Sequence, residues 1–391
     1  MKRSHPHRKC SLPAMFVSLS ALVLISISIL LFLYRPSSNS VSAVAAAADP
    51  GSSSLPELPR FSYFISGTAG DSGRLRRLLR ALYHPRNYYL LHLDFAASDA
   101  ERLDLAKFVK SEPAVSLFQN VMVMGKGNLV TSKGPTVMAS TLHAAAILLR
   151  KAPNWDWFIN IGSSDYPLMP QDDILHIFSY LPRDLNFIEH TSDIGWKEFQ
   201  RARPIIIDPG LYHSKRSGVF WAKEKRSLPA SFKLFMGSAL MILSRSFLEF
   251  CIWGWDNLPR TLLMYYTNTL SSEEAYFHTV ACNHRDYQNT TVNHSMRYVR
   301  WDEPPREEPA NLTARDFDGM VGSGAPFGHS IPENDPLLDL IDRKLLLLLT
   351  DKEKRNPGDG VVVRPHSGSK RLEKLVVTLL DSHNFRSRQC K

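Results

Sequence analysis

Carboxylates stand where several predicted β-strands end, and such side chains could hold sugar hydroxyls or transfer protons. Asp94 closes the apolar run 87–94, Asp165 follows a strand-like run, and Glu189 stands near the end of another. Each of them singly is also compatible with a buried structural carboxylate or a helix cap. In an open parallel sheet, however, ligands bind beyond the carboxyl ends of the strands. We therefore expect the three carboxylates to line one polar cleft.

Strand-like and helix-like runs alternate over the first part of the folded chain. Short apolar runs predict strands at 61–67, 87–94, 115–124, 155–161 and 185–190. Leucine- and alanine-rich runs with helical spacing predict helices at 70–83, 98–112, 134–152 and 171–181. This alternation predicts an α/β fold with a mostly parallel, Rossmann-like sheet and helices on both faces. After about residue 200 the alternation ends, and aromatic residues and prolines become frequent.

The common phosphate and metal motifs are missing from the sequence. It contains no P-loop, no H-E-x-x-H and no C-x-x-C. Gly67, Gly70 and Gly73 have a spacing that indicates no more than a turn. Asp316 and Asp318 form a D-x-D but follow no predicted strand, so we expect a surface turn or a helix start there. The residues themselves therefore predict no metal site.

An uncharged apolar segment covers residues 12–34 and follows four basic residues. About 20 apolar residues span a bilayer as a helix, and flanking positive charge marks the cytoplasmic side. We predict a cytoplasmic tail at 1–11, a single transmembrane signal anchor at 12–34, a flexible stem at 35–59 and a luminal domain at 60–391. A cleaved signal peptide is the alternative, but its apolar core is normally about 7–15 residues long.

The net charge of +9 is concentrated at the two ends of the chain. Residues 1–11 contribute +4, and residues 343–391 hold twelve Lys/Arg against five Asp/Glu, which gives +7. The part between them is therefore close to −2. A nucleic-acid-binding protein would instead show a basic face on its folded domain. Nucleic acid is accordingly not an expected partner.

Three N-glycosylation sequons agree with a luminal domain, and they begin at Asn289, Asn293 and Asn311. A short tail, one membrane span, a stem and a large luminal domain are typical of type II Golgi membrane enzymes. Of the four cysteines, Cys10 falls in the predicted tail. At most one disulfide can form among the other three, and the sequence does not choose its partners. Those three are Cys251, Cys282 and Cys390.

Five segments resemble the core-2/I-branching glycosyltransferase family, glycosyltransferase family 14. They are 132–149, 155–174, 232–268, 271–283 (SSEEAYFHTVACN) and 293–305. They are most similar to the family's plant branch of β-glucuronosyltransferases, which act on arabinogalactan proteins. The resemblance implies a GT-A-like fold, a UDP-sugar co-substrate and inversion at the anomeric carbon. It also implies that neither a divalent metal nor another cofactor is needed.

Inverting transfer needs a carboxylate that takes the proton of the attacking acceptor hydroxyl. The resemblance assigns this role to Glu274, whereas the residue types alone do not separate Glu274 from Glu273. It also implies an acceptor-binding set, in which the arginine position could shift to Gln200. That set is Glu189, Lys197, Arg201 and Trp301. Surface ion pairs and core packing are the ordinary alternatives for these residues.

The departing UDP needs positive charge near its diphosphate. Family members carry F-A-R-K-F or a similar segment for this purpose, whereas here residues 327–331 read F-G-H-S-I. His329 and Ser330 thus stand in place of the basic pair. A histidine is largely neutral at pH 7 and partly charged in a mildly acidic lumen. The resemblance also implies that Asp94 and Asp165 contact the donor nucleotide and sugar.

Other cations could replace the missing basic pair. We expect donor binding from Arg306 and, in a basic C-terminal helix, from Lys370 and Arg371, with Arg364 and Lys374 as further candidates. A solvated helix face is the alternative for the residues of that helix.

The sequence therefore predicts a Golgi enzyme that transfers glucuronic acid from UDP-glucuronate to galactan chains of type II arabinogalactan. A family member that uses UDP-GlcNAc or UDP-xylose is one alternative. A non-catalytic, membrane-anchored glycan-binding protein is another, which the F-G-H-S-I segment favours. A hydrolase with paired carboxylates is disfavoured by the resemblance.

Overall fold

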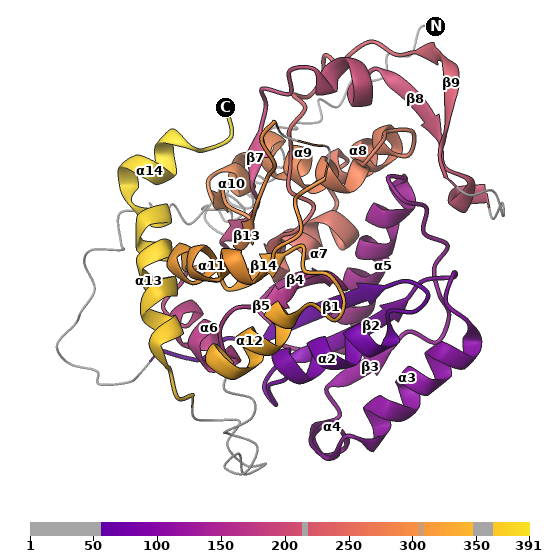
Figure 1. Cartoon of the computed structure of the whole chain (residues 1–391). Coiled ribbons are helices and arrows are strands. Elements are labelled where there is room, and N and C mark those ends of the chain that lie inside the picture. Colours follow the sequence, from indigo (N-terminus) through magenta and orange to yellow (C-terminus); the bar gives the residue numbers. More distant parts are fainter. Residues whose placement is uncertain (1–55, 213–217, 305, 307, 347–362) are drawn as a thin grey trace, which may run out of the picture. The chain divides into compact units, whose positions relative to one another are not determined.

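The computed structural model describes residues 56–212, 218–304, 306, 308–346 and 363–391 (Figure 1). The predicted tail, the predicted anchor at 12–34 and the stem up to residue 55 lie outside the described residues. Within the described ranges, no helix combines the length and the apolar character that a membrane span requires.

The centre of the fold is a seven-stranded sheet with the order β12-β6-β11-β4-β1-β2-β3. Pairing is parallel between β1 and both of its neighbours, between β2 and β3, and between β6 and β12. β11 alone runs antiparallel to both neighbours, β4 and β6. The strands are β1 (Phe61–Gly67), β2 (Tyr88–Leu93), β3 (Val121–Val123), β4 (Trp157–Gly162), β6 (Asn186–Phe187), β11 (Ile242–Ser244) and β12 (Thr291–Val292).

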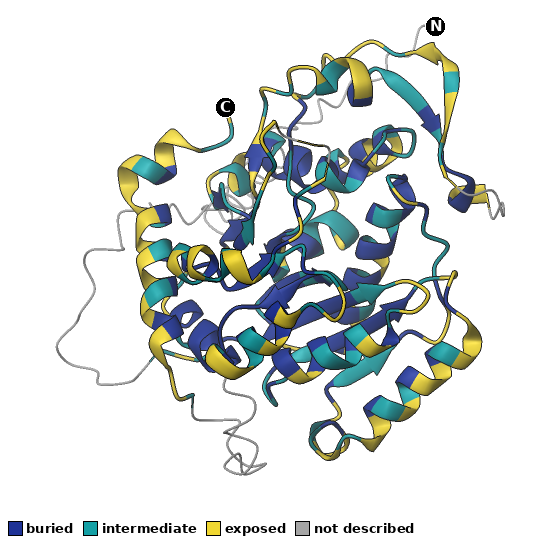
Figure 2. Cartoon of the chain, in the orientation of Figure 1, coloured by how far each residue is buried: buried dark blue, intermediate teal, exposed yellow. Residues whose placement is uncertain are grey.

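Helices cover both faces of this sheet, because alternate side chains of each strand enter different cores. Phe61, Tyr63 and Ile65 of β1 pack into one core, and Phe64 packs into the other. The strands are buried beneath the helices (Figure 2). The first face is covered by α2 (Ser72–Leu82), α3 (Asp99–Ser111), α6 (Gln171–Phe178), α12 (Pro336–Lys344) and α13 (Ser367–Leu380). The second is covered by α5 (Pro135–Lys151), α7 (Arg245–Trp253), α8 (Leu258–Tyr266) and α9 (Tyr276–Asn283).

Smaller sheets and turns surround the central sheet. One has the order β13-β14-β5 and consists of Arg297–Val299, Phe327–His329 and Tyr166–Pro167. Two pairs join β7 (His190–Thr191) to β10 (Met236–Gly237) and β8 (Pro204–Ile207) to β9 (Phe220–Lys225). The remaining elements are α4 (Pro113–Phe118), α10 (Arg285–Gln288), α11 (Phe317–Ser323), α14 (Ser382–Ser387) and the short turns η1 (Glu198–Ala202), η2 (Pro209–Tyr212), η3 (Ser272–Glu274) and η4 (Ala314–Asp316).

The predicted alternation of strands and helices is confirmed, with errors in two runs. The predicted strand 185–190 is split into β6 and β7, which belong to different sheets. The larger error is at residues 115–124. The first half of that run is the helix α4, and only Val121–Val123 forms a strand. Pro113 stands in the first turn of α4, where its missing N–H costs no helical hydrogen bond. Gln119 then ends the helix in a left-handed conformation at φ 48°. The apolar run hid this helix because short buried helices and strands look alike in sequence.

Two open points of the sequence are decided by the structure. Cys282 and Cys390 form a disulfide across 108 residues of sequence, and Cys251 is the free thiol. Asp316 belongs to a capping box with Thr313 at the start of η4, which leads into α11. The predicted turn or helix start at this D-x-D is therefore confirmed, and its first carboxylate is used for capping.

Candidate active site

Glu274 lies in the turn η3, directly before α9, and is ion-paired with Arg201 of η1. Arg201 Nη1 donates to Glu274 Oε2. The arginine side chain is only 8% exposed, whereas the glutamate side chain is 27% exposed. The structure thus brings the predicted base together with a predicted acceptor residue, while Gln200 is exposed. A buried guanidinium on one oxygen fixes the carboxylate and leaves its other oxygen, Oε1, for a substrate proton.

Glu273 has a different environment from its neighbour. Its Oε2 is shielded from solvent and has no hydrogen-bond partner among the described residues. Burial raises the pKa of Glu273 to about 8, and the charge of Glu274 adds to this effect while Arg201 opposes it. At neutral or mildly acidic pH Glu273 is therefore a neutral acid. Glu274, which is partly exposed and paired with Arg201, is therefore the better placed of the two carboxylates to take a proton from a substrate.

The turn that carries these glutamates rests on the start of α5. Ser271 N donates to Lys133 O over 2.8 Å. Next to this contact, the buried Asp208 accepts hydrogen bonds from Thr136 N and Oγ1 and from Gly210 N. These supporting residues were missed from the sequence, although the Asp-Pro-Gly turn at 208–210 was a visible signal. The Ser271–Lys133 bond ties the residue before η3 to the start of α5, and the bonds of Asp208 tie the 208–210 turn to the same start.

The predicted donor carboxylates lie along the carboxyl edge of the sheet. Asp94 follows β2 and accepts hydrogen bonds from Thr68 Oγ1 and Ala96 N. Asp165 follows β4, on the other side of β1, so the two are about 10 Å apart, two strand spacings. Glu189 follows β6 at the same edge, two strands further along. The three carboxylates therefore share one edge, as expected, but spread over about 20 Å of it.

Asp165 accepts a hydrogen bond from His329, which lies in the F-G-H-S-I segment. Asp165 Oδ1 accepts from His329 Nδ1 over 2.7 Å, and Oδ2 accepts from Gly162 N. The pair forms because His329 ends β14 and Asp165 directly precedes β5, and these two strands are paired antiparallel. The bond fixes the orientation of the imidazole ring. His329 is 23% exposed and Asp165 is fully buried.

Two arginines that the sequence reasoning missed lie near this histidine. Arg74, in the first turn of α2, donates from Nη2 to Ile331 O over 2.8 Å. Arg297 is buried and donates to Asn160 O and Ser295 O. Burial lowers the pKa of Arg297 to about 10, although the charge of Asp165 opposes this. In sequence Arg74 is one of a run of basic residues on an amphipathic helix, which gave no signal for the site.

The remaining predicted acceptor residues have less defined surroundings. Glu189 is exposed just before β7, and Trp301 is 51% exposed just after β13. Lys197 is half-buried and precedes η1. It lies within electrostatic reach of His278 on α9, whose pKa is lowered to about 3, chiefly by burial. The neutral His278 donates from Nε2 to Ser238 O.

Most of the predicted substitute cations are not brought to Asp94 and Asp165. Arg306 is largely exposed and pairs with Asp302. Lys370 and Arg371 lie in the first turn of α13, which packs beside the start of α6. The start of α6 lies near the amino ends of β1 and β2, because Gln171 Oε1 accepts a hydrogen bond from Asn87 Nδ2, next to both ends. Asp94, in contrast, lies beyond the carboxyl end of β2. Arg364 and Lys374 are exposed on the same C-terminal segment.

The three sequon asparagines differ in exposure. Asn289 and Asn311 are exposed. Asn293 is half-buried, accepts a hydrogen bond from His190 N and donates to the carbonyls of His190 and Arg388. The side-chain nitrogen that would carry a glycan is thus already engaged.

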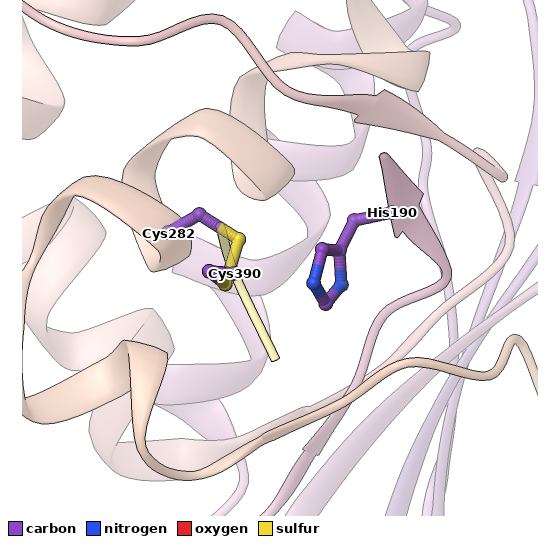
Figure 3. A group of neighbouring side chains, drawn as sticks. All are labelled: His190, Cys282 and Cys390. Atoms are coloured by element: carbon purple, nitrogen blue, oxygen red, sulfur yellow. A yellow bond between two sulfur atoms is a disulfide. The ribbon is translucent and has the colours of Figure 1, made fainter. Parts of the chain in front are cut away.

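His190, Cys282 and Cys390 form a compact group of potential metal ligands (Figure 3). Their ligand atoms all lie within 4.8 Å of one another. The two sulfurs are joined in the disulfide, however, and metals bind the thiolate form of cysteine. In this state the group offers one imidazole, and its disulfide ties the C-terminal segment to α9.

Comparison with known proteins decides the family. A family model described as core-2/I-branching enzyme matches residues 61–321, which is more than half of the chain. The chain belongs to the core-2/I-branching enzyme family. It is 60% identical to β-glucuronosyltransferase GlcAT14C of Arabidopsis thaliana, over the whole length of both chains. It is 28% identical to human xylosyltransferase 2, over 62% of this chain and 26% of that protein.

Membership of this family makes the chain a glycosyltransferase, and its fold is mixed α/β. The solved structure of the WbbM bifunctional glycosyltransferase has a TM-score of 0.37 to this chain at 10% identity, and covers 75% of this chain and 50% of its own. The family match ends before residues 327–331, the segment that carries His329.

Proposed function

We propose that the chain is an inverting β-glucuronosyltransferase that transfers glucuronic acid from UDP-glucuronate to galactan chains of type II arabinogalactan. The full-length similarity to a plant β-glucuronosyltransferase supports the donor sugar. The observation that carries the mechanism is the ion pair between the buried Arg201 and Glu274. It leaves the Glu274 carboxylate partly accessible, whereas the raised pKa of the neighbouring Glu273 favours its neutral form.

Glu274 acts as the general base in this reaction. An acceptor hydroxyl of galactose approaches Oε1 while Arg201 holds Oε2. The hydroxyl oxygen attacks the anomeric carbon from the face opposite UDP, and its proton passes to Glu274. A new glycosidic bond forms as the bond between the anomeric carbon and the phosphate oxygen breaks, so the configuration inverts.

The carboxyl edge of the sheet receives the donor. Asp94, at the end of β2, contacts the uridine part, and Asp165 lies nearer to the sugar and the diphosphate. The charge that develops on the departing UDP is stabilised by Arg74 and by the Nε2 of His329. Because these side chains supply the positive charge, transfer proceeds without a divalent metal.

The enzyme works in the Golgi lumen as a single-pass type II membrane protein. The apolar segment 12–34, with basic residues before it, and the three sequons support this location. Protease protection of the full chain in microsomes tests the orientation: the domain from residue 60 onward is protected until detergent is added.

A non-catalytic, glycan-binding role is the second candidate. The replacement of the basic pair by His329 and Ser330 favours it, because a neutral segment stabilises a diphosphate poorly. The Arg201–Glu274 pair favours catalysis, since a binding protein has no need of a fixed base.

Transfer by the detergent-solubilised full chain tests the proposal. UDP-glucuronate, UDP-GlcNAc and UDP-xylose are offered separately with β-galactan oligosaccharides in EDTA, and NMR gives the anomeric configuration of the product. We expect a β-linked glucuronide from UDP-glucuronate alone. Transfer from another donor would contradict the assignment of UDP-glucuronate as the donor. The absence of any transfer by folded protein would favour the non-catalytic role.

A further inference from the structure

Two residues with a left-handed backbone conformation meet where the turn η3 is tied to α5. Ser271 has φ 49° and ψ 49°, and Lys133 has φ 60°. Their backbones are joined directly, because Ser271 N donates to Lys133 O over 2.8 Å. This conformation is costly for a residue with a β-carbon, since the β-carbon comes too close to the following carbonyl oxygen. Backbone strain is thus present on both sides of one hydrogen bond.

Ser271 connects this hydrogen bond to the backbone of Glu274. The N–H of Ser271 donates to Lys133 O, and its C=O accepts from Glu274 N over 3.0 Å. Two consecutive backbone hydrogen bonds therefore run from the start of α5, through Ser271, to the proposed base. Ser271 is buried. The position of the Glu274 backbone thus depends on the φ and ψ angles of this one buried residue.

The far end of this path, at the start of α5, is closely packed. Gly134 follows Lys133, and a β-carbon on Gly134 would lie only 2.3 Å from Asp208 Oδ2. Gly134 N donates to Thr131 O, and Thr131 N donates to Thr136 Oγ1 over 2.8 Å. The turn before α5 is therefore closed by its own hydrogen bonds and packed directly against a buried carboxylate. Lys133 O is thus an acceptor with a well-defined position.

Glycine would adopt both left-handed conformations without the steric cost of a β-carbon. The chain does use glycine for such a conformation at Gly324, which has φ 72° and ends α11. Glycine also has access to a much wider range of φ and ψ, so it allows a turn to move. A β-carbon leaves only a narrow left-handed region. Non-glycine residues that keep this strain at a functional site define the position of the backbone there.

We infer that Ser271 is a positioning residue, whose left-handed backbone, restricted by its β-carbon, holds Glu274 in place for proton transfer. Lys133 supports Ser271 in the same way from the start of α5. The effect belongs to the backbone and the β-carbon, so alanine should serve almost as well as serine at position 271, whereas glycine should not. The inference rests on the proposed function for the role of Glu274 as the base.

Comparison of glycine with alanine at each position tests the inference in the detergent-solubilised full chain. We expect Ser271→Gly to lower kcat about three- to tenfold and to change the KM for β-galactan little, because a mobile base is misplaced for part of the time. Ser271→Ala is the conservative variant and should recover most of that loss. Lys133→Gly should likewise have a lower kcat than Lys133→Ala. Gln119, which ends α4 at φ 48°, is the matched control, and Gln119→Gly should leave kcat unchanged.

Two measurements without substrate separate positioning from a general loss of structure. Because glycine relieves left-handed strain, neither Ser271→Gly nor Gln119→Gly should lower Tm. Amide hydrogen exchange in residues 271–275, measured by mass spectrometry, should be faster in Ser271→Gly than in the wild type and in Ser271→Ala.

Equal kcat values in the wild type, Ser271→Gly and Ser271→Ala would overturn the inference, as would an equal loss in both variants. Unchanged amide exchange in Ser271→Gly, or a clearly lower Tm, would also overturn it. If the wild type transfers nothing and exchange still rises in Ser271→Gly alone, Ser271 positions the turn and it is the proposed function that fails.

Discussion

The turn that carries Glu274 and the strand ends that carry Asp94 and Asp165 are built in different ways. Around Glu274 the support is buried: Arg201 is almost fully shielded, Asp208 accepts three hydrogen bonds, and Ser271 is tied to α5. At the strand ends, His329 is partly exposed. Arg74 donates a hydrogen bond to the carbonyl of Ile331 and not to a carboxylate.

The surroundings of Glu274 are therefore more rigidly supported than the strand ends that carry Asp94 and Asp165. In the proposed mechanism the base is already ion-paired with Arg201 before any substrate binds. The proposed diphosphate side has His329, which Asp165 orients, and no basic pair at 329–330. We therefore expect changes near Glu274 to damage the enzyme more than changes near His329.

Arg201→Met gives the largest expected effect apart from replacement of the base itself. It removes the group that is ion-paired with Glu274 and whose charge also acts on Glu273. We expect kcat to fall by about 10²- to 10³-fold, the range for a misplaced proton acceptor. Arg203→Met is the matched control, because Arg203 pairs with Glu198 and is 41% exposed. An equal fall in kcat in Arg201→Met and Arg203→Met would contradict a special role for the ion pair with Glu274.

His329→Ala gives a smaller expected effect. Loss of one donor to the departing diphosphate should lower kcat by about tenfold or somewhat more, and weaken inhibition by UDP. His329→Lys restores a permanent cation and should recover the rate. His383→Ala, on exposed α14, is the control. An unchanged rate and UDP affinity in His329→Ala would show that this segment plays no part in donor binding.

Glu273→Gln alters the pH dependence of stability. Because the pKa of Glu273 is raised from 4.5 to about 8 in the folded protein, the folded state holds this proton more tightly than the unfolded state. Its contribution to the free energy of unfolding is therefore lost as the pH rises between those values. We expect Glu273→Gln to raise Tm by about 2–4 °C at pH 7.5 and to leave it unchanged at pH 4.5, by calorimetry. Parallel pH profiles for the variant and the wild type would contradict the buried, neutral acid.

Sequon occupancy gives the smallest expected effect. We expect glycans on Asn289 and Asn311 in protein from a secretory host. We expect little on Asn293, because its side-chain amide is hydrogen-bonded to the backbone of His190 and Arg388. Glycopeptide mass spectrometry measures this. Full occupancy of Asn293 would contradict this prediction, because a glycan there would displace the hydrogen bonds of the Asn293 side chain.

The sheet and its flanking helices were predictable because their apolar residues follow regular periods. β1 was predicted at its observed bounds, and α5 and α6 begin within one residue of the prediction. The run 115–124 failed because Pro113 and Gln119 act through backbone conformation, which periodicity does not report.

The site was predictable only in part. Family resemblance pointed to Glu274 and Arg201 as separate residues, but their ion pair joins segments 73 residues apart and needs the folded chain. Arg74 gave no signal, because its role depends on where α2 meets the segment after β14. The sequence showed the charge of the cations on α13 but not the position of that helix beside α6.

The most direct test compares Glu274→Gln with Glu273→Gln in transfer from UDP-glucuronate to β-galactan. The two substitutions are identical in chemistry and adjacent in the chain, so each controls for the other. We expect Glu274→Gln to lose about 10²- to 10⁴-fold in kcat, as for removal of a general base, and Glu273→Gln to keep most of its activity. If Glu273→Gln is inactive and Glu274→Gln is active, the buried acid and not the arginine-paired carboxylate is the base, and the proposed mechanism is wrong.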